Sequence, residues 1–267
     1  MHKSFIILKK MELNSVKEEW LQFVPISGFK GDNLTSKSAN LSWWKGGTLL
    51  DILQNLKEPK RPSNLPLRIP IQSTYFKKGP GVIVPSGRVA TGTLKSSQKV
   101  VFAPSNQEAV LKSIQMYSDG LNEAFPGNNI AMNLIEKVDV DVGHICGDPE
   151  NDPPFECENF TAEMSILNVT GNIKAGYRPT FCCHTSSAAC KFVKILERTD
   201  PKTNKVIKNP DWIKKGDRAV VVVEPVTPFV IEPFHKYPQL GCFAVRNDKQ
   251  TVAVGIVRSV QKKEQKK

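Results

Sequence analysis

The chain has 267 residues, of which 40% are hydrophobic and 24% charged, with 17 Gly and 19 Pro. This composition excludes an intrinsically disordered chain, a collagen-like repeat and a small scaffold held together by disulfides. The 37 Lys and Arg residues outnumber the 26 Asp and Glu residues, and the formal net charge of +11 favours an anionic partner such as RNA, a nucleotide or an acidic protein. A basic surface that only keeps the protein soluble is the open alternative.

The sequence carries no pattern typical of export or membrane insertion. Its apolar run near the N-terminus, residues 5–8, is much shorter than the apolar core of a signal peptide. No stretch approaches the roughly 18 consecutive apolar residues of a membrane span. The six cysteines lie in apolar, strand-like contexts and two of them are adjacent, which favours reduced thiols over a disulfide framework. We therefore expect a cytoplasmic protein without a membrane partner.

The pattern of residues 1–58 predicts helices and loops. This segment is too short to bury a convincing core of its own. Two capping boxes are expected to begin short helices, Ser15 with Glu18 and Thr48 with Asp51. The apolar residues of the second helix share one face and need a partner surface: Leu49, Ile52, Leu53 and Leu56.

From residue 59 onward the pattern changes to short strands separated by turns, which predicts a mainly β fold of two consecutive β-barrels. Residues 59–153 form the first expected barrel, residues 154–261 the second, and residues 262–267 a basic tail. The expected strands are 81–84, 99–102, 110–116, 130–134, 161–167, 180–185, 191–197, 218–224, 229–233 and 251–260.

The motifs of several enzyme classes are missing. The sequence has no Walker A loop, no His-Glu-x-x-His and no Gly-x-Ser-x-Gly, so it predicts neither a phosphate cradle nor a zincin or α/β-hydrolase site. Cys182, Cys183 and His184 could suggest zinc, but consecutive strand residues point to opposite faces. We expect no catalytic and no metal site, and we interpret the cysteines as buried thiols.

Five segments in a fixed order resemble eukaryotic elongation factor 1-alpha, and the similarity runs from about residue 14 to residue 263. The resemblance implies a GTPase domain followed by two β-barrels that together carry aminoacyl-tRNA to the ribosomal A site. The segments are Phe23 to Asn33, Gly87 to Gly92, Asn151 to Pro154, His184 to Phe192 and Phe243 to Gly255.

By this resemblance, residues 1–58 are the C-terminal remnant of the GTP-binding domain, a short α/β segment. Ser27, Gly28 and Phe29 match the family's Ser-Gly-Trp loop beside the guanine base. The phosphate loop, both switches and the Asn-Lys-x-Asp base reader would lie upstream of Met1. GTP and Mg²⁺ are cofactors of the full-length family, but we expect neither cofactor nor GTP hydrolysis in this chain, because nothing in it positions the triphosphate.

In the first barrel, the resemblance assigns the aminoacylated CCA end of tRNA to a surface that includes Arg88, Gln115 and Asn129. Asn129 matches the family asparagine that approaches the aminoacyl group, and a side-chain amide can both donate and accept hydrogen bonds there. Gln115 stands where the family has a glutamate against the terminal adenine. The family glutamate in Gly-Arg-Val-Glu-Thr-Gly is Ala90 here.

In the second barrel, the resemblance brings five residues to the acceptor and T stems of tRNA. Such contacts would be independent of sequence, because an A-form helix presents phosphates and 2′-hydroxyl groups rather than readable base edges. Cys242 replaces an arginine of the family. The five residues are His184, Thr185, Arg246, Lys249 and Gln250.

Three hypotheses of function are consistent with the sequence. The first is an aminoacyl-tRNA binding module of a translation elongation factor, which would also meet the ribosome. The second is an interaction module, since the family's first barrel also docks the nucleotide-exchange factor of the elongation factor 1-beta type. The third is a paralogue among the release and rescue GTPases.

Overall fold

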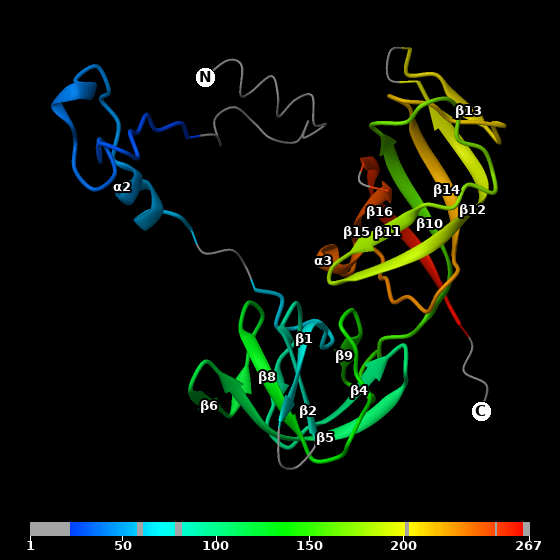
Figure 1. Ribbon diagram of the computed structural model, residues 1–267, viewed down its shortest axis with the longest axis horizontal. Coiled ribbons are helices and arrows are strands. Elements are labelled where there is room, and N and C mark those ends of the chain that lie inside the picture. Colours follow the sequence, from blue (N-terminus) through cyan, green and yellow to red (C-terminus); the bar gives the residue numbers. More distant parts are fainter. Residues whose placement is uncertain (1–21, 58–60, 78–81, 201–202, 249, 264–267) are drawn as a thin grey trace. The chain divides into compact units, whose positions relative to one another are not determined.

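The computed structural model describes residues 22–57, 61–77, 82–200, 203–248 and 250–263. The chain divides into two compact units, residues 1–60 and residues 61–267 (Figure 1). The expected capping box of Ser15 and Glu18 lies outside the described residues.

The described part of the first unit contains the 3₁₀-helix η2 (Ala39–Leu41) and the helix α2 (Leu49–Gln54). The predicted capping box at the start of α2 is confirmed: the Thr48 hydroxyl accepts a hydrogen bond from Asp51 N at 3.1 Å, and the Asp51 carboxylate accepts one from Thr48 N at 2.9 Å. No residue of α2 is buried, and Leu53 is 53% exposed. On the apolar face of this segment, Leu53 and Leu56 are therefore exposed, whereas Leu49 and Ile52 are half-buried.

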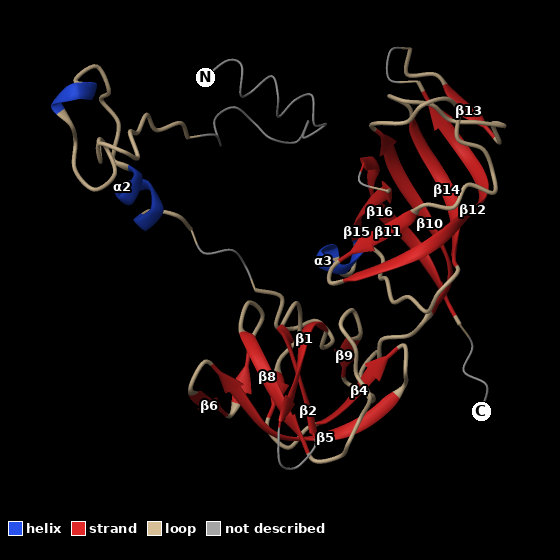
Figure 2. Ribbon diagram, viewed as in Figure 1, coloured by secondary structure: helices blue, strands red, loops and turns tan. Residues whose placement is uncertain are grey.

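The first barrel is a closed ring of antiparallel strands in the order β4-β9-β1-β2-β8-β5, with β4 pairing back to β5 (Figure 2). The short strand β6 extends the sheet beyond β5, and β3 pairs separately with β7. The bounds are β1 Ile69–Lys77, β2 Val82–Arg88, β3 Leu94–Lys95, β4 Lys99–Ala103, β5 Gln107–Met116, β6 Asp119–Leu121, β7 Glu123–Ala124, β8 Asn129–Leu134 and β9 Ile145–Gly147.

The second barrel closes in the same way, in the order β11-β15-β16-β10-β14-β12, with β11 pairing to β12. Strand β13 extends this sheet beyond β12. The bounds are β10 Cys157–Ile166, β11 Thr180–Cys183, β12 Ser186–Thr199, β13 Val206–Lys208, β14 Arg218–Pro225, β15 Cys242–Asn247 and β16 Gln250–Lys262. A single helical turn, α3 (Pro238–Gly241), precedes β15.

Each barrel has its own apolar core, built from alternate residues of its strands, whose side chains point inward. In β10 the inward positions include Phe160, Ala162 and Met164, and all three are at most 1% exposed. Phe160 packs edge-on against Phe181 of β11, with ring centroids 5.5 Å apart. The predicted fold of two β-barrels is thus confirmed.

The predicted strand over 229–233 is wrong, because this segment is extended and buried but pairs with no sheet. Pro228 and Pro233 bound it, and proline has no N–H to give to a sheet. Its backbone makes isolated hydrogen bonds instead of a sheet ladder. Phe229 O accepts from Cys157 N at 2.8 Å, and Glu232 N donates to Leu240 O at 3.2 Å. Seven of the described strands were not expected: β1, β3, β6, β7, β9, β13 and β15. Strand β16 continues to Lys262, the first residue of the expected tail.

Candidate nucleic-acid interface

The structure brings the three predicted residues of the first barrel onto one face. Arg88 at the end of β2 lies directly opposite Asn129 at the start of β8. Gln115 of β5 lies opposite Ala131, two residues beyond Asn129 and so on the same side of β8. All three side chains are exposed, and opposite residues of antiparallel strands have Cβ atoms only about 5 Å apart. We call Arg88, Gln115 and Asn129 the first-barrel surface.

A tight turn before β8 shapes this surface. Gly127 has φ +101°, a conformation that favours glycine, and its N–H donates to Val89 O at 2.8 Å. A Cβ at Gly127 would lie 3.8 Å from Nη1 of Arg61 and 3.9 Å from Nη2 of Arg88. Two guanidinium groups therefore lie at one turn. Sequence reasoning missed Arg61, whose only signal was its positive charge next to Pro62.

In the second barrel, Arg246 and Gln250 are exposed on neighbouring strands. Arg246 of β15 lies between Thr180 of β11 and Thr251 of β16 in the register of the sheet. Gln250 lines an open groove of about 590 Å³. We call Arg246 and Gln250 the second-barrel surface. Lys249 lies outside the described residues, so its predicted role has no structural account.

His184 lies in the turn between β11 and β12 and is used within the fold. Its backbone has φ +45°, its Nε2 donates to Val230 O at 3.0 Å, and its ring stacks on Phe229 with centroids 6.5 Å apart. Nδ1 lies 3.3 Å from the hydroxyl of Thr185. Burial lowers the pKa of His184, so the imidazole is neutral at pH 7. The ring therefore holds the 229–232 segment, while Thr185 is partly exposed beside it.

Ser27, Gly28 and Phe29 form a surface turn closed by the hydrogen bond from Ser27 N to Asp32 O at 3.2 Å. The Phe29 side chain is 101% exposed, so it packs on nothing in the described unit. Such a turn could lie beside a base, but a triphosphate needs convergent backbone amides and a cation. The described residues offer no such loop and no cluster of metal ligands, so they do not fit GTP with Mg²⁺.

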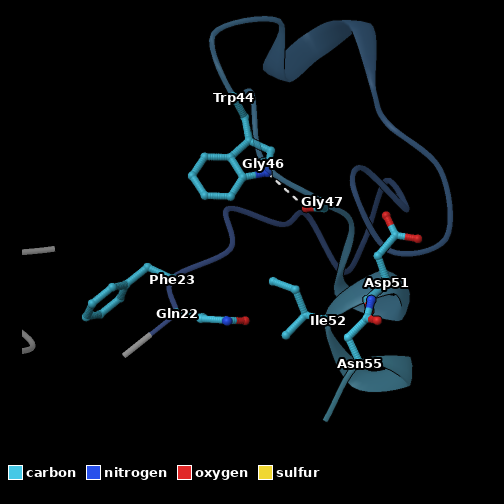
Figure 3. A pocket seen from close by; sticks show the side chains of 8 residues that line it. All are labelled: Gln22, Phe23, Trp44, Gly46, Gly47, Asp51, Ile52 and Asn55. Carbon is cyan, nitrogen blue, oxygen red and sulfur yellow. Dashed lines mark hydrogen bonds between the residues drawn. The ribbon is translucent and has the colours of Figure 1, made fainter. Parts of the chain in front are cut away.

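A pocket of about 560 Å³ lies elsewhere in the first unit (Figure 3). The indole of Trp44 forms one side, with Nε1 donating to Gly47 O at 3.0 Å, and Ile52 of α2 faces the cavity. The predicted guanine-site residues are not among its lining residues. The full lining is Gln22, Phe23, Trp44, Gly46, Gly47, Asp51, Ile52 and Asn55.

Three charged residues and a tyrosine lie where the two barrels meet, and we call Arg68, Asp152, Glu232 and Tyr237 the junction cluster. Arg68, just before β1, is fully buried. Its Nε and Nη2 lie 2.9 and 2.7 Å from Oε1 of Glu232, and its Nη1 donates to the carbonyl oxygen of Asp152 at 2.7 Å. Its guanidinium stacks on the Tyr237 ring, 4.6 Å from the centroid.

The carboxylate of Asp152 completes this cluster. It accepts hydrogen bonds from Tyr237 Oη and Lys236 Nζ, both at 2.8 Å. Burial alone would raise the pKa of Asp152, but these bonds and the charges of Lys262 and Arg68 hold it well below its usual range. Asp152 was expected only as part of a stiff junction, and neither Arg68 nor Glu232 was expected to be buried.

The cysteines match their interpretation only in part. Cys146, Cys157, Cys183 and Cys190 are buried free thiols, whereas Cys182 is partly exposed and Cys242 exposed. Burial raises the pKa of Cys190 to about 12, so this thiol stays protonated. Within the described ranges, His, Cys, Asp and Glu side chains form no group suited to a metal ion. Of the described helices, none has the length and apolar character needed to cross a bilayer.

Known proteins resemble the chain in sequence and in structure. Residues 159–258 match the family described as GTP-eEF1A C-terminal domain-like. Proteins named elongation factor 1-alpha from Stylonychia lemnae and Eimeria bovis are each 44% identical to the chain, covering 98% and 92% of it and 60% and 72% of their own length. The crystal structure of sup35 complexed with GMPPNP superposes with a TM-score of 0.70 at 27% identity, covering 89% of this chain and 58% of that one. The chain thus spans about 60% of the Stylonychia protein.

Proposed function

The chain belongs to the elongation factor 1-alpha family, and from this membership we propose that its two barrels bind aminoacyl-tRNA and take part in its delivery to the ribosomal A site. The observation that carries the proposal is the first-barrel surface. Arg88 and Asn129, distant in sequence, lie opposite each other on adjacent strands, with Gln115 on the same face.

The first-barrel surface combines the groups that an aminoacylated RNA end requires. The Arg88 guanidinium can bind a phosphate through two parallel N–H donors. The Asn129 amide can donate to an ester carbonyl and accept from an amino group. Gln115 can pack against a base without adding a negative charge. We assign recognition of the charged 3′ end to this surface.

The second-barrel surface supplies contacts that do not depend on RNA sequence. Arg246 has no carboxylate partner among the described residues, so its charge is available to a phosphate. Gln250 of this surface, and the partly exposed Thr185 outside it, offer donors and acceptors suited to 2′-hydroxyl groups. We assign the acceptor and T stems to this surface. None of these proposed contacts involves GTP.

Filter binding of charged and uncharged tRNA over a salt series tests the proposal. If several phosphates are neutralised, the apparent binding constant should fall by orders of magnitude between about 50 and 200 mM salt, because counterions are released. Arg246→Gln should lower the slope of log K against log salt by about one unit. Asn129→Ala should leave the slope unchanged and reduce discrimination between charged and uncharged tRNA.

Arg258→Gln is the matched control, because it removes the same charge from β16 at a site already engaged. The Arg258 guanidinium donates to Glu163 at 2.9 and 3.0 Å. Its loss should not change the salt slope. If tRNA does not bind even at the lowest salt, or binds without salt dependence, the RNA proposal fails. A binding partner of the exchange-factor type, docking on the first barrel, then becomes the better account.

A further inference from the structure

The two barrels meet at the junction cluster, at a small apolar contact, and where Gly143 of the first barrel approaches Ser186 of the second. In the apolar contact, residues of the first barrel meet residues of the second: Ala90, Ala103 and Ile145 against Val230, Tyr237 and Leu240. Two of these six residues are alanines. An apolar contact of this size is non-directional, so it brings the barrels together without fixing their relative rotation.

The charged part of the junction is directional. Arg68 uses three nitrogens on partners from three places: Glu232 in the second barrel, Asp152 in the linker, and the Leu67 carbonyl oxygen at 3.0 Å in its own chain segment. Glu232 is only 3% exposed and Arg68 not at all. A rotation of one barrel would separate these buried charges, and an unpaired buried charge is strongly unfavourable.

Backbone hydrogen bonds connect Arg68 to the first-barrel surface. Arg68 N donates to Thr91 O at 3.1 Å, and Ala90 N donates to Arg68 O at 2.8 Å. Two residues before Ala90 is Arg88, and Val89 N donates to Asn128 O at 3.0 Å, immediately before Asn129. Arg68 is therefore separated from Arg88 and Asn129 by only a few bonded residues.

On the second-barrel side, hydrogen bonds and strand pairing connect the cluster to the second-barrel surface. Glu232 lies two residues after Val230, whose carbonyl oxygen holds His184 in the turn between β11 and β12. Strand β11, which ends at Cys183, pairs with β15, and Thr180 lies opposite Arg246. Short runs of hydrogen-bonded residues and paired strands thus connect the junction cluster to the elements that carry the two proposed RNA surfaces.

We propose that Arg68 is a positioning residue for RNA binding: by its contacts with Glu232 and Asp152 it holds the barrels in one orientation, so that the first-barrel and second-barrel surfaces contact one RNA molecule together. This inference rests on the proposed function. Two surfaces held at the spacing of one rigid ligand bind with an avidity that can exceed either affinity by about 10²- to 10⁴-fold. Loss of the fixed orientation reduces that gain, because the second contact then carries an ordering cost, and it leaves each surface unchanged.

The first measurement asks whether Arg68 fixes the orientation, without any RNA. In Arg68→Lys the positive charge remains, but an ammonium group lacks the planar set of donors that reaches Glu232 and Asp152 together. Tyr237→Phe is a milder second variant that removes only the hydroxyl bonded to Asp152. Glu163→Gln is the control, since it breaks an exposed carboxylate–arginine pair away from the junction.

Nuclear spin relaxation of backbone amides gives a rotational correlation time for each barrel. In the parent chain and in Glu163→Gln the two barrels should tumble with one common time. In Arg68→Lys the two times should differ, and Tyr237→Phe should show a smaller difference. If both junction variants tumble as the parent does, Arg68 does not hold the barrels and the inference is overturned.

The second measurement compares two probes, full aminoacyl-tRNA and an aminoacylated CCA trinucleotide, which is long enough for the first-barrel surface alone. Arg68→Lys should weaken tRNA binding by about 10²-fold or more and leave trinucleotide binding within about twofold. Equal weakening of both probes, or unchanged tRNA binding despite separate tumbling, would overturn the positioning role. If neither probe binds the parent chain, the proposed function fails, and with it the RNA part of the inference, whereas relaxation still decides whether Arg68 holds the barrels.

Discussion

Replacing Asp152 with Asn should destabilise the chain by an amount that follows from its contacts. An asparagine keeps the shape and still accepts from Tyr237, so only the charge-dependent attraction to Arg68, Lys236 and Lys262 is lost. The two lysine side chains are 43% and 37% exposed, and such pairs contribute about 0.5 kcal/mol each. The buried Arg68 Nη2, at 3.2 Å, adds about 1 kcal/mol. The free energy of unfolding should therefore fall by about 2 kcal/mol at pH 7.

The pH dependence of this loss tests the reasoning more sharply than its size. The folded chain holds the pKa of Asp152 well below its usual value. A depressed carboxyl pKa stabilises the fold fully above the unfolded pKa of about 3.9, and this stabilisation is lost as the pH falls toward the folded value. The difference between the parent and Asp152→Asn should thus stay constant from about pH 8 to pH 5 and shrink only below about pH 4.

Urea denaturation followed by far-ultraviolet circular dichroism at several pH values measures this difference. Glu163→Gln is again the control and should cost less than about 1 kcal/mol, because its pair with Arg258 is exposed. A loss for Asp152→Asn that is no larger than the control's, or one that disappears between pH 7 and pH 5, would refute the account of the junction cluster.

Three further predictions concern other parts of the chain. Thr48→Ala should cost about 1 kcal/mol of local helix stability, seen as faster amide exchange at Asp51, whose N–H loses its acceptor. Because burial lowers the pKa of His184, the parent's stability should decline as the pH falls below about 6.5. His184→Asn, whose side chain tolerates positive φ, should abolish this decline. Thermal denaturation at several pH values measures it. Deletion of residues 1–58 should reduce self-association in light scattering, because Leu50, Leu53 and Leu56 of the first unit are 41%, 53% and 65% exposed.

Much of the fold follows from local sequence, and the exceptions have a physical cause. The alternation in β10 and the apolar run in β14 predict their strands, because side-chain direction in a strand depends only on position. Strand β9 has only three residues, all buried, so no alternation exists to detect. The 229–233 segment has the composition of a strand, but its partners Cys157 and Leu240 come from elsewhere in the chain. Tertiary contacts, rather than propensity, decide its conformation.

The candidate site, like the fold, has residues that the sequence indicates and residues that only the structure shows. The resemblance identified Arg88 and Asn129, and the register of β2 with β8 places them together. The burial of Arg68 was not predicted, because a charged residue is expected at the surface and its acid partner Glu232 lies 164 residues away. His184 is predicted to contact RNA from the resemblance alone, and the sequence does not show that its N–H is donated to Val230, 46 residues later. Pairings at such separations leave no periodic trace in a single sequence.

The use of buried charges at the junction, where apolar residues would also pack, bears on how the barrels can act together. Apolar contacts permit many relative rotations at similar energy, because they depend on area rather than direction. A guanidinium held by a carboxylate and by backbone carbonyl groups is satisfied in one geometry only. Since Arg68 and Glu232 are both buried, every other rotation leaves a charge unpaired away from water. A duplex RNA is itself rigid, so binding both surfaces without an ordering cost requires that their spacing be fixed before it arrives. The junction cluster meets that requirement with residues that need not contact the RNA.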